Sequence, residues 1–188
     1  MSQPRIIAGK ARGIRLQDVP GNTTRPVTDR VKEALFNILG TDVAGANFLD
    51  LFGGTGSVGI ESLSRGAKKC VFLEVSSQAI STIKNNLKAT RLDEFAQVIQ
   101  MDAFRYLEKL PAEKFEYVYI APPQYKKMWI KALELVDRNQ DLLTEDGWVI
   151  IQIHPVELEE IYLSNLQEFD RREYGSTLLL FYSRKDFK

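Results

Sequence analysis

The sequence predicts an α/β protein built on a mostly parallel sheet with helices on both faces. The first observation is a glycine-rich loop that stands between an apolar run at 47–51 and a helical pattern of apolar residues beginning after Ser57. The second is that apolar runs and amphipathic segments alternate from this loop onward. Such alternation is typical of a parallel sheet, which binds ligands at the carboxyl ends of its strands.

The expected elements follow from the periodicity of the apolar residues. Helices are expected near 57–65, 77–89, 103–109, 126–138 and 155–164. Strands are expected near 47–51, 70–74, 96–100, 115–120, 147–153, 167–173 and 177–183. Because no helical pattern separates the last two strands, we expect an antiparallel hairpin at one edge of the sheet.

Residues 1–40 are expected to form a small extension ahead of the sheet domain, which spans 41–188. Two apolar pieces, 6–7 and 14–16, flank a bend with basic residues, which is the pattern of a hairpin. Apolar spacing then predicts a helix that ends at Gly40 and is capped by Thr28 or Asp29.

Composition limits the class of protein. With 188 residues, of which 44% are hydrophobic and 27% charged, the chain resembles an ordinary globular protein, and we expect a monomer. No apolar segment resembles a signal peptide or a membrane span, so we expect a cytoplasmic protein with no membrane partner. The single cysteine, Cys70, is expected to be a buried core thiol. With one histidine besides, no metal site is predicted.

The net charge is zero, but its distribution is uneven. Residues 1–40 hold seven basic and three acidic residues, whereas 41–188 hold 18 basic and 22 acidic ones. A basic extension beside a ligand site is able to bind phosphates, although a solvated charged loop explains the charges equally well. The candidates for phosphate contact are Arg5, Lys10, Arg12, Arg15, Arg25 and Arg30.

The glycine loop points to a nucleotide-like ligand. Gly54, Gly56 and Gly59 form the pattern G-x-G-x-x-G, in which the missing side chains let a ligand approach the main-chain amides. Glu74 ends the next apolar run, 20 residues after Gly54, where a carboxylate is able to accept hydrogen bonds from ribose hydroxyls. This context favours a ligand over a purely structural glycine turn.

Two later strand ends carry further candidates. Asp102 and Ala103 follow the third strand, where a carboxylate or an amide would meet an adenine amine; Asp102 suits the N-cap of the next helix equally well. The sequence APPQY at 121–125 follows the fourth strand. The carboxyl ends of parallel strands share one edge of a sheet, so we expect these residues and Glu74 along the same edge.

Three segments carry a resemblance to a known family: RIIAGKARG at 5–13, RPVTDRVKEALFNIL at 25–39, and DLFGGTGSVGIE at 50–61 with SRGA at 64–67. Together they resemble the class I S-adenosylmethionine-dependent methyltransferases and, within them, the 16S rRNA (guanine-N2)-methyltransferases. The resemblance implies a Rossmann-like fold of seven strands with the last strand inserted antiparallel. It also implies S-adenosyl-L-methionine as cofactor and methylation of small-subunit ribosomal RNA, free or in an assembling small subunit.

The same resemblance implies roles for individual residues. Glu74 would hold the ribose of the cofactor, and Asp102 with Ala103 its adenine. The loop residues at the amino-acid end of the cofactor would be Asp50, Phe52, Gly53, Gly54, Thr55 and Gly56. The catalytic motif of the family, Asp or Asn followed by two prolines and an aromatic residue, corresponds to Ala121, Pro122, Pro123 and Tyr125, with Gln124 intervening.

Ala121 departs from the family motif. The lone pair of a guanine N2 amine is delocalised into the ring, and an acceptor that takes its N–H hydrogen bonds localises electron density on the nitrogen. Ala121 keeps its carbonyl but has no side-chain acceptor. A lost buried hydrogen bond of about 1–3 kcal/mol would slow methyl transfer by roughly 10- to 100-fold.

This departure leaves several functions open. The first is an active guanine-N2 methyltransferase that relies on the carbonyls of Ala121 and Pro122. The second is a cofactor-binding, RNA-binding protein with weakened or lost catalysis. A methyltransferase acting on another amine, such as adenine N6, is also compatible. A nicotinamide-dependent dehydrogenase fits the glycine pattern, but 188 residues leave little room for its second nucleotide half.

Three residues near these strand ends have competing interpretations. For Tyr125 we favour stacking on the target base over packing against Trp129 in the core. Gln124 is a candidate substitute for the missing acceptor. His154 follows an apolar run at 148–153, and a structural role is favoured over a place in the pocket.

Overall fold

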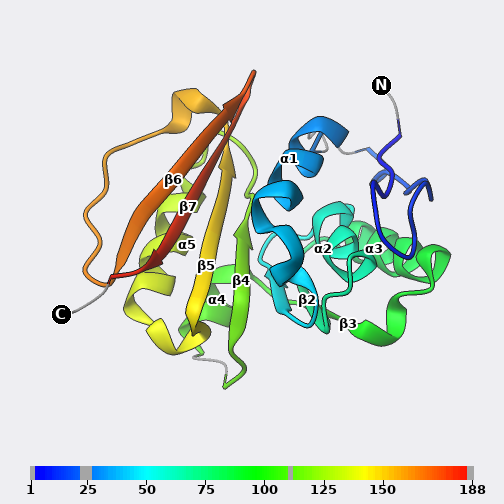
Figure 1. Cartoon of the computed structure of the whole chain (residues 1–188), viewed down its shortest axis with the longest axis horizontal. Helices are drawn as coiled ribbons and strands as arrows, with labels where there is room; N and C mark the ends of the chain where they lie inside the picture. The colour runs from blue at the N-terminus through cyan, green and yellow to red at the C-terminus, as the bar shows by residue number, and fades with distance from the viewer. Residues whose placement is uncertain (1–2, 22–26, 110–111, 186–188) are drawn as a thin grey trace. The chain divides into compact units, whose positions relative to one another are not determined.

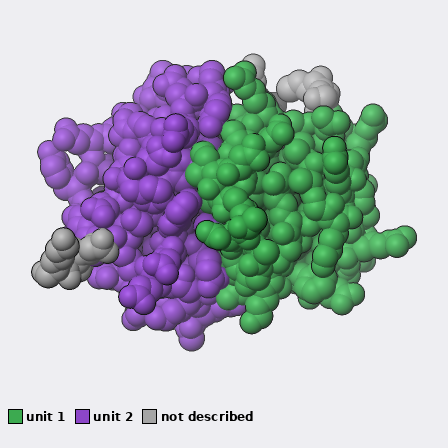
Figure 2. Space-filling view, viewed as in Figure 1, with its two compact units in different colours: residues 1–101 green, residues 102–188 purple. Residues whose placement is uncertain are grey.

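The computed structural model describes residues 3–21, 27–109 and 112–185. The chain divides into two units, Met1–Met101 and Asp102–Lys188, which Figures 1 and 2 show by element and by surface. Its seven strands belong to one mixed sheet, as predicted. Among the described residues, no helix combines the length and apolar character that crossing a bilayer requires.

The first unit contains three parallel strands in the order β3-β2-β1. A hairpin precedes them, closed by an antiparallel bridge between Arg5 and Arg15, as predicted. The helix after it is capped by Thr28, whose hydroxyl accepts a hydrogen bond from the amide of Val31. The elements are α1 (Asp29–Leu39), η1 (Gly40–Val43), β1 (Asn47–Asp50), α2 (Ser57–Ser64), β2 (Lys69–Glu74), α3 (Ser77–Thr90), η2 (Asp93–Phe95) and β3 (Ala96–Gln100).

The core of the first unit lies between its strands and helices. Helix α2 packs so closely on β2 that a Cβ atom at Gly59 would lie 2.3 Å from the ring of Phe72 and 2.7 Å from the sulfur of Cys70. Cys70 is buried, as predicted, and burial raises the pKa of its thiol. This close packing fixes the start of α2, and therefore the glycine loop before it.

The second unit contains four strands in the order β4-β5-β7-β6. Strands β4 and β5 are parallel, whereas β7 is antiparallel to both β5 and β6. The last strand is thus inserted antiparallel and forms the predicted hairpin with β6 (Figure 1). The elements are α4 (Ala103–Glu108), β4 (Phe115–Ile120), α5 (Met128–Arg138), η3 (Gln140–Leu142), β5 (Leu143–Ile153), η4 (Pro155–Glu157), β6 (Leu166–Tyr174) and β7 (Thr177–Arg184).

The predicted helix at 155–164 is wrong. Only the short 3-10 turn Pro155–Glu157 forms, and the chain then runs irregularly to β6. The physical reason lies at the end of α5, where the buried carboxylate of Asp137 accepts hydrogen bonds from the amides of Ser164, Asn165 and Leu166 at 2.8–3.0 Å. These tertiary bonds hold the end of the segment at α5, and they override its local helical pattern.

Candidate functional site

The glycine loop and Glu74 come together in the first unit, as predicted from their spacing. The amide of Gly54 donates a hydrogen bond to Oε2 of Glu74 at 3.0 Å. The other oxygen of Glu74 accepts from the amides of Val75 and Ser76 at 2.8 and 2.9 Å. Gly54 and Gly56 have φ values of 55° and 78°, the left-handed region that favours glycine. The loop is therefore a tight turn with a carboxylate held beside it.

Asp50 is buried at the end of β1, with 2% of its surface exposed. Its Oδ1 atom has no hydrogen-bond partner among the described residues. Burial raises the pKa of this carboxyl to about 7, whereas hydrogen bonds from the backbone of Phe52 and Gly59 oppose the shift. A buried carboxylate oxygen without a partner is costly, so a ligand that donates an N–H to it is stabilised there.

The loop has room for such a ligand. A Cβ atom at Gly54 would meet nothing closer than the carbonyl of Phe52 at 3.9 Å in the described part of the chain. Asp50 offers an acceptor for an ammonium group, and Glu74 offers one for hydroxyl groups. This donor and acceptor chemistry fits a cofactor that joins an amino acid to a ribose.

Asn86 is a loop contact that the sequence analysis missed. Its buried amide on α3 donates to the carbonyl of Thr55 at 2.9 Å and to that of Gln17 at 3.1 Å. Its oxygen accepts from the amide of Gln17 at 2.7 Å. The spacing from Ile83 and Leu87 places Asn86 on the buried face of the helix, and a polar residue there was the available signal.

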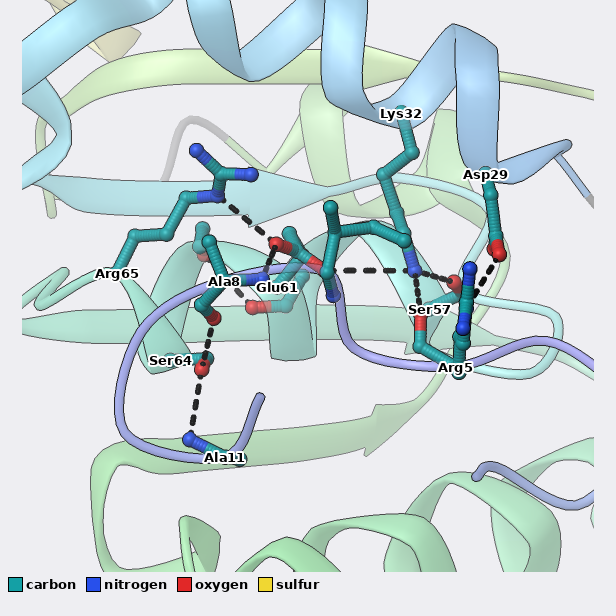
Figure 3. A network of polar contacts seen from close by, with 12 residues as sticks. Arg5, Ala8, Ala11, Asp29, Lys32, Ser57, Glu61, Ser64 and Arg65 are labelled. Carbon is teal, nitrogen blue, oxygen red and sulfur yellow. Dashed lines mark hydrogen bonds and ion pairs between the residues drawn. The ribbon is translucent and has the colours of Figure 1, made fainter. Parts of the chain in front are cut away.

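The basic hairpin is fixed on helix α2, immediately after the glycine loop (Figure 3). Glu61 is fully buried, and its two carboxylate oxygens accept from the amides of Ile7 and Ala8 at 2.8 and 3.0 Å. The hydroxyl of Ser64 accepts from the amide of Ala11 at 2.9 Å. These bonds satisfy the main chain of the hairpin with side chains of α2.

Lys32 ties the hairpin and helix α1 to the first turn of α2. Its fully buried ammonium donates to the carbonyl of Arg5 and to the hydroxyl of Ser57, and it lies 3.4 Å from Glu61 (Figure 3). Burial lowers the pKa of Lys32, and the charge of Glu61 opposes this effect. Since Ser57 directly follows Gly56, the hydrogen bond from Lys32 to Ser57 anchors the end of the glycine loop.

The predicted RNA contacts lie mainly on the surface of this extension. The Nε atom of Arg5 lies 2.7 Å from the carboxylate of Asp29, and this ion pair offsets part of the positive charge that Arg5 would offer to RNA. Arg25 lies outside the described residues. The remaining candidates, Lys10, Arg12, Arg15 and Arg30, are exposed.

In the second unit, Asp102 caps helix α4. Its carboxylate accepts from the amide of Arg105 at 3.0 Å, and Ala103 begins the helix. The prediction that Asp102 is the N-cap of this helix is therefore confirmed. A role toward adenine stays a prediction for both residues.

The double-proline turn follows β4 and presents Tyr125 to solvent. Tyr125 is 67% exposed, whereas Trp129 is fully buried, so a core role for the Tyr125 ring is excluded. Its ring centroid lies 6.1 Å from that of His154. The Nδ1 atom of His154 accepts from the amide of Val156 at 3.2 Å, the structural role that was favoured for this residue. Gln124 is exposed, and Ala121 and Pro122 are partly buried.

Comparison with known proteins identifies relatives over nearly the whole chain. The family model described as "Conserved hypothetical protein 95" matches residues 4–183. A Bacillus subtilis protein named "Putative rRNA methyltransferase YlbH" is 40% identical over 185 residues, which cover 96% of this chain and 99% of the relative. The Haemophilus influenzae "Ribosomal RNA small subunit methyltransferase D" is 32% identical over 79% of this chain and 86% of its own.

A solved structure shares the fold. The Escherichia coli protein described as "Putative methyltransferase yhhF" superposes with a TM-score of 0.83 at 29% identity, covering 98% of this chain and 99% of that one. The fold is therefore that of the class I methyltransferases, as the sequence predicts.

Proposed function

The chain belongs to the family described as "Conserved hypothetical protein 95", and on that premise we propose that it is an S-adenosylmethionine-dependent methyltransferase. Its substrate is small-subunit ribosomal RNA, and the acceptor is the exocyclic N2 amine of a guanine. It acts in the cytoplasm as a monomer. The observation that carries the proposal is the buried oxygen of Asp50 that has no partner among the described residues, beside a glycine loop and a carboxylate held by amides.

Each loop residue would bind a different part of the cofactor. Asp50 accepts from the ammonium group, the amides of 53–56 line the amino-acid end, and Glu74 accepts from the ribose hydroxyls. Asp102 and Ala103 are assigned to the adenine by their position in the family motif. The cofactor, when bound, supplies an electrophilic methyl group on a sulfonium.

The double-proline turn is assigned to the target base. The carbonyls of Ala121 and Pro122 accept hydrogen bonds from the N–H groups of the guanine amine and direct its nitrogen toward the methyl group. The exposed ring of Tyr125 stacks on the base. Two prolines restrict the backbone, so the carbonyls are held before the substrate arrives. No side-chain carboxylate at position 121 is needed in this arrangement.

Methyl incorporation into naked 16S RNA and into isolated small subunits tests this function. We expect a single modified guanine, located by mass mapping of nucleotides. Tyr125→Ala should lower incorporation about 10-fold or more because a stacked base is worth about 1–3 kcal/mol. Tyr162→Ala, a control at another exposed tyrosine of the same unit, should leave it unchanged.

The alternatives give different results in the same assay. Cofactor and RNA binding without incorporation, with activity created by Ala121→Asp, would identify an RNA-binding protein that has lost catalysis. Modification of adenine would reassign the acceptor amine. Binding of a nicotinamide dinucleotide in place of S-adenosylmethionine would overturn the proposal altogether.

A further inference from the structure

Two turns at the carboxyl ends of neighbouring strands meet in the second unit. Strand β4 ends at Ile120 and leads into the double-proline turn, and β5 ends at Ile153 and leads into the 3-10 turn Pro155–Glu157. The two strands are parallel, with Ile120 opposite Ile151. Both turns therefore leave the same edge of the sheet, close enough for side chains of one to reach the main chain of the other.

Tyr125 has an unusual backbone conformation for a side chain of its size. Its φ is 64°, in the left-handed region that residues other than glycine rarely adopt. Lys127, two residues later, has a φ of 52°. Such conformations persist where the surrounding structure holds them, and they cluster at functional sites.

Glu157 provides the contact that holds Tyr125. Its Oε1 atom accepts a hydrogen bond from the amide of Tyr125 at 2.7 Å. Its Oε2 atom accepts from the amide of His154 at 3.3 Å, within a capping box that fixes the 3-10 turn. A second tie joins the same segments, because the ammonium of Lys127 lies 2.6 Å from Glu159. The carboxylate of Glu157 is thus oriented before any substrate binds.

We propose that Glu157 is a positioning residue that holds Tyr125 in its left-handed conformation as a preformed stacking platform for the target base. This inference rests on the proposed function and adds a residue that no family motif above includes. A platform that is already in place spares the RNA complex the entropy of ordering the turn. Loss of Glu157 should therefore weaken productive RNA binding and leave cofactor binding unchanged.

Two substitutions separate a hydrogen-bond role of Glu157 from a charge role. The single amide oxygen of Glu157→Gln is able to accept from the amide of Tyr125, at the loss of the longer contact with His154, whereas Glu157→Ala removes both acceptors. We expect kcat/KM for 16S RNA to fall about 10-fold in Glu157→Ala and to stay within about twofold in Glu157→Gln. Equal behaviour of both variants would overturn the proposal, because an effect of charge on nearby phosphates would be the same in both.

A double-mutant cycle tests whether Glu157 acts through Tyr125. In a Tyr125→Ala background, Glu157→Ala should cause no further loss of kcat/KM, since the platform is already absent. Losses that multiply would overturn the proposal. Glu160→Ala, at an exposed acid of the same segment, is the matched control. The Kd of S-adenosylhomocysteine, measured by calorimetry, should be the same in all variants.

A structural readout keeps the two proposals distinguishable. The amide resonance of Tyr125 in a ¹⁵N-resolved NMR spectrum should shift in Glu157→Ala and return in Glu157→Gln. An unchanged resonance in Glu157→Ala would overturn the positioning role even if the enzyme methylates RNA. A parent protein that transfers no methyl group to RNA would instead contradict the proposed function, while the resonance still reports the contact.

Discussion

Asp50 lowers the stability of the folded chain at neutral pH. Its carboxyl has a pKa of about 7 in the folded state against 3.8 as the ordinary value. A raised acid pKa means that stability is lost as pH rises from about 4 through 7 and stays lost above. Asp50→Asn should therefore raise the free energy of unfolding by about 1–4 kcal/mol at pH 8, with the gain shrinking toward pH 4.5. Urea unfolding at both pH values checks this, and a gain that does not depend on pH would contradict it.

The same carboxyl should make cofactor binding depend on pH. Only the charged form of Asp50 attracts the ammonium group of the ligand, so below a pKa of about 7 binding must first remove a proton. The affinity for S-adenosylhomocysteine should rise about 5- to 10-fold between pH 6 and 7.5. Asp50→Asn should bind more weakly and lose most of this dependence. Calorimetry at the two pH values tests it; an equal pH dependence in the variant would remove Asp50 from the site.

Gly59 and Gly54 have different roles, in packing and in ligand binding, and alanine substitutions should separate the two effects. Gly59→Ala places a methyl group 2.3 Å from the Phe72 ring, so we expect a loss of about 1–3 kcal/mol in the free energy of unfolding. Gly54→Ala meets no clash, with the Phe52 carbonyl at 3.9 Å, and its main stability cost is the left-handed φ, about 1 kcal/mol. Its effect should fall on cofactor affinity. Denaturant unfolding and calorimetry on both variants separate the two; a stable Gly59→Ala protein would contradict the packing argument.

The buried carboxylate of Glu61 on helix α2 binds the basic hairpin, and it is paired with both Lys32 and Arg65. Removing one partner of a buried ion pair costs up to about 3–5 kcal/mol when the other charge is left alone. Glu61 would keep Arg65 and two amide donors after loss of Lys32, so the cost here should be smaller. Lys32→Met should therefore lower the free energy of unfolding by about 1–3 kcal/mol and speed hydrogen exchange at the amides of Ile7 and Ala8. Lys84→Met, at an exposed position of α3, is the control and should change neither. Slow exchange in the Lys32 variant would show that Glu61 holds the hairpin alone.

The elements that sequence predicts well are those whose pattern is local. Strands β1 to β4 and helices α2 to α5 fall within about two residues of the expected bounds, because local apolar periodicity and turn residues mark their ends. The helix expected at 155–164 fails because Asp137, far away in sequence, binds the amides of Ser164 and Asn165 where the segment ends.

The candidate site follows the same rule. The glycine loop and Glu74 are predictable because the G-x-G-x-x-G pattern marks the turn and the end of an apolar run marks the strand end. Asn86 could be found only as a polar residue on a buried helix face, without its partners, and Glu157 could not be found, since its partner is the main-chain amide of Tyr125, 32 residues away. Side chains that bind distant amides leave no periodic pattern. The contact exists only once the strands have set the two turns side by side.

Charge at the scale of the whole chain separates a basic extension from an acidic remainder. The net charge is zero, so any attraction for RNA depends on where the basic residues are held. The hairpin and the residue after it are fixed by bonds to Glu61, Ser64 and Asn86, which holds Lys10, Arg12 and Arg15 in defined positions on the first unit. A flexible basic tail would not hold its charges at fixed positions.

Salt dependence tests this surface directly. Each phosphate contact releases counterions, and for single-stranded RNA it adds about 0.7 to the slope of log Kobs against log salt concentration. Replacing Lys10, Arg12 and Arg15 together by alanine should therefore lower the slope by about 2 and weaken binding most at low salt. The control replaces the exposed Lys68, Lys84 and Lys88, which lie elsewhere in the first unit and change the net charge equally. Equal slopes in the two triple variants would mean that total charge, and not the hairpin surface, attracts the RNA.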